Sequence, residues 1–119
     1  MSRVRLGIAV GVIAVFFVVG GIIILANLHQ GGQNVTFNLT VTGAKAMSPS
    51  TLSAHQNDII TINIKSDTDG EVHLHVYDIA FDTKAGQTVS HTFKADKTCG
   101  CDIEWESTST PLGSLTVSP

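Results

Sequence analysis

Two histidines separated by one residue are the clearest candidates for chemistry in this chain. His73 and His75 lie in the segment EVHLHVY, whose alternation of polar and apolar residues is typical of a β-strand. Side chains two positions apart project from the same face of a strand, so these imidazoles are placed to chelate one copper or zinc ion. In the alternative interpretation, Val72, Leu74 and Val76 face the core and the histidines belong to an exposed polar face.

His91 is a third candidate ligand. It shares a strand face with Val89 and Phe93, and we expect that face to point inward. A buried neutral histidine with one hydrogen-bond partner is one interpretation. A three-imidazole site shared with His73 is the other.

The two cysteines, Cys99 and Cys101, flank Gly100 in a hairpin loop that we expect after Ala95. Residues i and i+2 of an extended strand are too far apart for an unstrained disulfide, although Gly100 allows the chain to bend. Three states are therefore open: a strained or redox-active disulfide, two thiols without a metal, and a thiolate site for Cu(I).

The elements that must position these residues are short β-strands. Turn-prone residues recur about every 8 to 12 positions, and no segment between them has a helical period. About eight strands result, which favours a β-sandwich. We expect them at residues 34–41, 50–55, 59–65, 71–77, 79–83, 88–95, 101–106 and 112–117. The expected core anchors are Phe37, Ile60, Ile62, Ile64, Phe93, Ile103, Trp105 and Leu115.

An apolar segment precedes this part of the chain. Residues 7–28 contain no charge, and a helix of that length is roughly 33 Å long, enough to span a bilayer. The segment is longer than the apolar part of a secretory signal, and no A-x-A cleavage site forms around Ala26, so we expect an uncleaved anchor. Arg3 and Arg5 precede it, which predicts a cytoplasmic N-terminus and an extracytoplasmic, periplasmic C-terminal part in the cell membrane.

These boundaries predict a cytoplasmic segment at 1–6, a transmembrane helix at 7–28, a linker at 29–33 and an outer domain at 34–119. All ten acidic residues and five of the seven basic ones follow the apolar segment, which gives the outer part a formal charge of −5. Nucleic acid is therefore not an expected partner. The chain has no nucleophile elbow, no HExxH motif and no phosphate-binding glycine loop, so we do not expect an enzyme.

The order of the motifs SPSTLSAHQNDIITI, GEVHLHVYDIAF, KAGQTVSHTFKADK and LGSLTV resembles the cupredoxin-like domain family. The resemblance covers roughly Thr51 to Val117. The EVHLHVYD segment is similar to the HxHGYD element of a membrane-anchored bacterial subgroup, with Val76 where that subgroup has glycine. This resemblance implies a cupredoxin-like Greek-key β-sandwich of about eight strands, preceded here by one transmembrane α-helix.

Classical members of that family hold blue copper with two histidines, one cysteine and a weak axial ligand. The resemblance places His73 at the first histidine and Trp105 at the copper-binding cysteine, and residues 106–111 contain neither histidine nor methionine. It also places Cys101 on the core side with Ile103 and Trp105, which disfavours a metal site at the cysteines. The chain is therefore expected to keep the fold without the standard type 1 centre.

Two functions follow from these observations. The first is an accessory or interaction subunit of a larger membrane complex, of the respiratory or photosynthetic electron-transfer kind. The second is a copper-binding or copper-handling domain that uses His73 and His75, with His91 or the cysteine pair as further ligands. Copper is the cofactor of the second function only.

Overall fold

The structure is a computed structural model and describes residues 32–119. The anchor expected at residues 7–28 and most of the linker expected at 29–33 lie outside the described residues. Within residues 32–119, no helix is long and apolar enough to cross a membrane.

The described part of the chain is all-β, with nine strands and one short 3-10 helix. The 3-10 helix η2 (Glu106–Thr108) connects the last two strands. The strands are β1 (Asn34–Thr42), β2 (Ala46–Ser48), β3 (Thr51–His55), β4 (Ile59–Ser66), β5 (Gly70–Leu74), β6 (Ile79–Thr83), β7 (Thr88–Lys94), β8 (Cys99–Trp105) and β9 (Thr110–Ser118).

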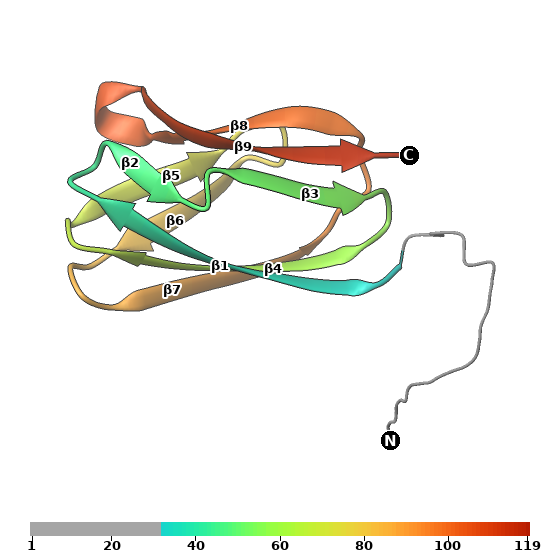
Figure 1. Cartoon of the computed structure of the whole chain (residues 1–119), viewed down its shortest axis with the longest axis horizontal. Helices are drawn as coiled ribbons and strands as arrows, with labels where there is room; N and C mark the ends of the chain where they lie inside the picture. The colour runs from blue at the N-terminus through green and yellow to red at the C-terminus, as the bar shows by residue number, and fades with distance from the viewer. Residues whose placement is uncertain (1–31) are drawn as a thin grey trace, which may run out of the picture. The chain divides into compact units, whose positions relative to one another are not determined.

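The strands form two sheets that face each other, as Figure 1 shows. One sheet has four strands in the order β2-β1-β4-β7, and the other has five in the order β3-β9-β8-β5-β6. Most neighbours are antiparallel, but β1 pairs with β4 and β3 pairs with β9 in parallel. The expected β-sandwich layers are therefore present in the described residues.

The core lies between the sheets because apolar residues alternate along most strands. Ile60, Ile62 and Ile64 of β4 are each at most 1% exposed, and they alternate with half-exposed polar residues. Six of the eight expected core anchors are buried, whereas Phe37 and Phe93 are only partly buried against the core. The sequence pattern therefore identifies most of the core correctly.

Several boundaries differ from the expectation. There are nine strands and not eight, because the three-residue β2 is too short to show an alternation. The expected strand 71–77 ends at Leu74, where a four-residue turn begins. The expected loop around Gly100 is part of β8, which lies in a different sheet from β7, so these two strands do not form a hairpin.

A buried carboxylate organises the end of the domain where β1 begins. Asp58 is 0% exposed, and its two oxygens accept hydrogen bonds from the backbone N–H groups of Gln33 and His55, at 3.1 and 2.9 Å. The backbone carbonyl of Asp58 also accepts a hydrogen bond from Ala95 N. One side chain thus fastens the start of β1 to the end of β3.

Candidate functional site

His73 lies on the outer face of the five-stranded sheet. Its neighbours Val72 and Leu74 are fully buried, so the alternation along β5 turns His73 away from the core. In the strand register, His73 lies opposite Glu104 of β8 and Ala80 of β6. The polar-face interpretation is therefore correct for the direction in which His73 projects.

The chain turns sharply after β5, which decides the place of His75. Val76 and Asp78 have φ angles of 75° and 54°, in the left-handed region that ends a strand. Glycine adopts this conformation without strain, whereas Val76 is a β-branched residue. The side chain of Val76 is 52% exposed, so it does not join the core as expected. His75 stays attached to the sheet because its N–H donates to Asp102 O at 2.9 Å.

Carboxylates occupy both ring nitrogens of His73. Nδ1 lies 2.9 Å from Oε1 of Glu106, and Nε2 lies 2.9 Å from Oδ1 of Asp78. Ionised carboxylates only accept hydrogen bonds, so the protonated imidazolium is the form of His73 that donates to both. The hydrogen bond to Glu106 raises the pKa of His73 above its ordinary value; partial burial opposes this rise and Asp78 adds to it.

This arrangement predicts how stability depends on pH. Because the folded-state pKa of His73 exceeds the unfolded value of 6.5, its stabilising contribution is complete below that pH and is lost as the pH rises through the folded pKa. In EDTA-treated protein, the urea midpoint should therefore fall more between about pH 6 and pH 8 in the wild type than in His73→Gln. Equal falls in the two proteins would contradict the assignment.

His75 lies beside His73 but does not share its partners. The two rings are stacked, with centroids 4.6 Å apart and planes 10° from parallel, and Nε2 of His75 is hydrogen-bonded to Glu104. A ring nitrogen binds a metal ion through a lone pair in the ring plane. Two parallel stacked rings direct these lone pairs along parallel planes, so this arrangement does not aim both imidazoles at one ion.

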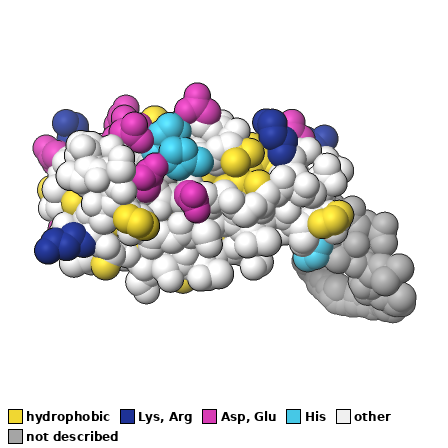
Figure 2. All heavy atoms as spheres, turned by 90° about the horizontal axis from the view of Figure 1, so that it is seen from above, with side chains coloured by type: hydrophobic (Ala, Val, Ile, Leu, Met, Phe, Trp, Pro, Cys, Tyr) yellow, Lys and Arg dark blue, Asp and Glu magenta, His cyan; other side chains and the backbone are white. Residues whose placement is uncertain are grey.

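A different set of ligand-type atoms does converge. Glu71, His73 and Glu106 each offer one ligand atom, and these atoms lie within 4.8 Å of one another. Figure 2 shows histidine side chains surrounded by Asp and Glu side chains on this face. Sequence reasoning missed Glu71 and Glu106 as candidates. The period-two spacing of Glu71 and His73 was a visible signal for the first, whereas the approach of Glu106 depends on how β5 and η2 pack.

His91 shares the expected face with Val89 and Phe93, but it is not buried. It is exposed on β7, which belongs to the four-stranded sheet, and its ring packs edge-on against Phe81 with centroids 5.0 Å apart. The expectation of a buried His91 is therefore wrong, although its side chain lies on the core side of β7, opposite the buried Ile62. The converging set found among residues 32–119 does not include it.

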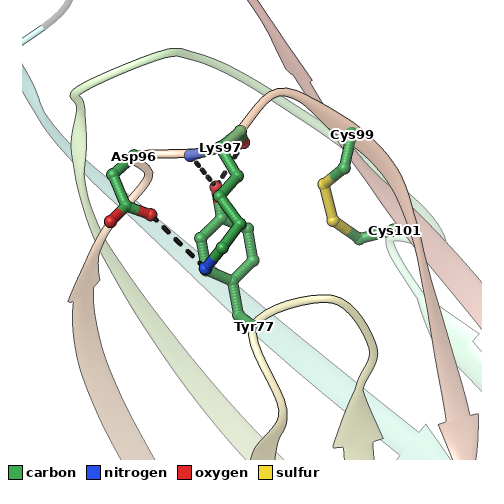
Figure 3. Close-up of a disulfide and its surroundings, with 5 residues drawn as sticks. All are labelled: Tyr77, Asp96, Lys97, Cys99 and Cys101. Carbon is green, nitrogen blue, oxygen red and sulfur yellow. Dashed lines mark hydrogen bonds and ion pairs between the residues drawn. A yellow bond between two sulfur atoms is a disulfide. The ribbon is translucent and has the colours of Figure 1, made fainter.

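The cysteines form a disulfide at the start of β8. Their Cα atoms are 5.3 Å apart, within the usual range for disulfides and shorter than the roughly 6.6 Å that two steps of extended strand would span. Cys101 is 0% exposed, as expected for the core side, and Cys99 is partly buried. Figure 3 shows the disulfide close to the loop where Lys97 N donates to the Tyr77 hydroxyl at 3.0 Å.

The residues near His73 do not fit a type 1 copper centre. Trp105 occupies the position aligned with the copper-binding cysteine, and its side chain is 4% exposed and packs on Gly70. The next residue, Glu106, is the one that reaches His73. Both cysteines of the chain are joined to each other in the disulfide, so neither offers the thiolate that such a centre needs.

Comparison with solved structures agrees with the resemblance noted in the sequence. A copper-binding protein studied in its apo form matches with a TM-score of 0.60 at 9% identity, over 76% of this chain and 92% of that one. The blue copper protein auracyanin A of Chloroflexus aurantiacus matches with a TM-score of 0.52 at 14% identity, over 71% of this chain and 98% of that one. The described domain is therefore cupredoxin-like.

Some matches are parts of larger proteins. A chain of a heme-copper terminal oxidase dimer matches with a TM-score of 0.60 at 12% identity, over 73% of this chain and 65% of that one. This chain also spans only 39% of the length of the multicopper oxidase mgLAC, which it matches with a TM-score of 0.53 at 14% identity. No protein-family model and no curated protein matches the sequence. At these identities the comparisons establish the fold alone.

Proposed function

We propose that this chain is a membrane-anchored, extracytoplasmic cupredoxin-like accessory or interaction subunit of a larger membrane complex that carries out respiratory or photosynthetic electron transfer. It does not itself act as a blue-copper electron carrier or as an enzyme. The fold supplies a rigid domain, and the predicted helix at residues 7–28 supplies the membrane attachment.

The replacement of the copper thiolate supports this proposal most strongly. A cupredoxin-like domain that carries electrons through type 1 copper needs a thiolate beside its imidazole. Here the end of β8 presents the buried Trp105 and then Glu106, whose carboxylate binds His73. The residues beside His73 therefore offer carboxylates where a type 1 centre needs a thiolate.

The surface of the domain suits a role in recognition. The strands of the five-stranded sheet contain no Lys or Arg, and its outer side carries several carboxylates. In Figure 1, the start of β1 and the short helix η2 lie at opposite ends of the domain. The carboxylates near η2 are thus remote from the point where the chain enters the domain, and they suit a partner surface that is positively charged.

The accessory role is tested in the organism's own membranes. The full chain with a C-terminal affinity tag is extracted in a mild detergent and purified, and co-purifying proteins are identified and quantified. We expect a larger membrane complex in a fixed ratio to the chain. A chain whose residues 7–28 are replaced by an unrelated transmembrane helix is the control for binding by the domain. Recovery of the chain alone would contradict the proposal.

Copper handling is the second candidate, and the neighbouring rings of His73 and His75 favour it. The side chain of His75 is 42% exposed, so it is not held by packing on all sides, and binding of copper by both rings would require it to leave its stacked position and its hydrogen bond to Glu104. Copper binds well to imidazole nitrogens, whereas carboxylate oxygens are better ligands for harder ions such as Mg²⁺ and Ca²⁺. Stoichiometric Cu(I) binding that is lost in both His73→Ala and His75→Ala would favour this second role.

A further inference from the structure

We propose that Glu71, His73 and Glu106 form a binding site for one divalent cation of the Zn²⁺ class. This site goes beyond the accessory role and does not depend on it. It also differs from the two-imidazole copper site, because its ligands are one imidazole and two carboxylates from β5 and η2.

The three side chains are already close to the separation that an ion requires. Their ligand atoms lie within 4.8 Å of one another, whereas ligands in a tetrahedral zinc site are about 3.4 Å apart. Glu106 is exposed, and Glu71 and His73 are half-buried, so the carboxylates are not locked by packing and have room to change rotamer toward an ion.

The orientation of His73 is the second observation that points to a cation. In metal sites, the histidine usually donates its remaining ring N–H to a carboxylate, which fixes the ring and its tautomer. Here Nε2 of His73 faces Asp78 at 2.9 Å, and Nδ1 faces Glu106 at 2.9 Å. A cation would displace the Nδ1 proton of the imidazolium, and with Nε2–H still held by Asp78 the freed lone pair of Nδ1 would point toward Glu106 of the proposed site.

The charges around the site favour a cation. Glu71 lies directly opposite Asp82 in the register of β5 and β6, a pair of like charges that destabilises a sheet when nothing compensates it. The five strands of this sheet contain no Lys or Arg that would balance the pair. The carboxylates of Glu71 and Glu106 would together neutralise one divalent ion.

The donor set also defines the class of ion. One nitrogen and two oxygens, without a thiolate, suit Zn²⁺. Cu²⁺ should bind the same atoms more tightly, because the affinity of a given site for divalent metals generally follows the Irving–Williams order. Three protein ligands leave a fourth tetrahedral position open, as in catalytic zinc sites. Water or a ligand atom from a partner protein would occupy that position.

The test is a calorimetric titration of the metal-free full chain in detergent with Zn²⁺, accompanied by the visible spectrum of the Co²⁺ form. We expect one ion per chain, and an affinity at least tenfold weaker in each of Glu71→Gln, His73→Gln and Glu106→Gln. Asp82→Asn removes a carboxylate of the same face that is outside the set, and His75→Gln removes the neighbouring imidazole. Both controls should stay within about threefold of the wild type.

Three results would overturn the proposal. The first is the absence of saturable Zn²⁺ binding in the wild type. The second is equal weakening by Asp82→Asn and Glu71→Gln, which would mean diffuse attraction to an acidic face. The third is loss of Zn²⁺ binding in His75→Gln while Glu71→Gln and Glu106→Gln bind Zn²⁺ normally, which would mean a two-imidazole site. Circular dichroism of each variant checks that it is folded, and none of these results depends on a membrane partner.

Discussion

Replacing Asp58 with alanine should destabilise the domain by about 3 kcal/mol, since hydrogen bonds to a buried charged acceptor contribute roughly 1.5 to 3 kcal/mol each. The Asp58 carboxylate accepts hydrogen bonds from the N–H groups of Gln33 and His55, and it is 0% exposed. Alanine would leave both donors without this acceptor. Urea unfolding followed by circular dichroism measures the change.

Asp102→Ala is the matched control, because Asp102 is an exposed aspartate on β8. Its replacement should change the free energy of unfolding by no more than about 0.5 kcal/mol. Asp58→Asn should lie between the two, since the amide keeps one acceptor oxygen. If Asp58→Ala is as stable as Asp102→Ala, the carboxylate does not hold this end of the domain together.

Replacing Gly113 with alanine should cost about 2 to 3 kcal/mol, as is typical of overpacking against a rigid neighbour. A Cβ atom on Gly113 would lie 2.1 Å from the backbone oxygen of Ser50 and 2.8 Å from Cε of Met47. The Ser50 oxygen is itself held, because it accepts a hydrogen bond from Ser114 N at 2.9 Å. Relief would therefore require movement of the backbone.

Gly100→Ala is the matched control for this second prediction. Gly100 lies on the neighbouring strand β8, opposite Thr116, and a Cβ atom there would meet nothing within 4 Å. This variant should be within about 0.5 kcal/mol of the wild type, or slightly more stable. Equal destabilisation by the two alanines would mean that loss of glycine, and not the contact with Ser50, is responsible.

The strands could be predicted from the sequence wherever one face is buried. The alternation of Ile60, Ile62 and Ile64 with polar residues identified β4 almost to its ends, and Asn34 to Val41 identified β1 equally well. The short β2 was missed because three residues contain no periodic signal. The early end of β5 was missed because Val76 continues the apolar alternation, although its backbone turns there.

The site was only partly predictable. His73 was identified from its residue type and its neighbour two positions away, both of which are local properties. Its partners come from other elements: Glu106 follows β8, and Asp78 is the last residue of a turn in which Val76 is also left-handed. Such contacts depend on strand register and on the path of the turn, and neither is visible in a local pattern.

The state of the cysteine pair also could not be predicted from the local sequence pattern. Spacing alone left a disulfide, free thiols and a metal site open for Cys99 and Cys101. The structure joins them in a disulfide because the start of β8 is contracted enough to bring their Cα atoms to 5.3 Å. Burial of Cys101 agrees with the family alignment, which carried information that spacing did not.

The domain proposed here differs from a blue-copper carrier in one respect that can be measured directly. The intense colour of type 1 copper requires a thiolate bonded to Cu²⁺, and the site at His73 offers carboxylates instead. The decisive measurement is the visible absorption spectrum of the full chain in detergent after addition of one equivalent of Cu²⁺. We predict only the weak absorption of copper bound by nitrogen and oxygen ligands. An intense blue band in a stoichiometric complex would contradict the proposal that this domain does not form a type 1 copper centre.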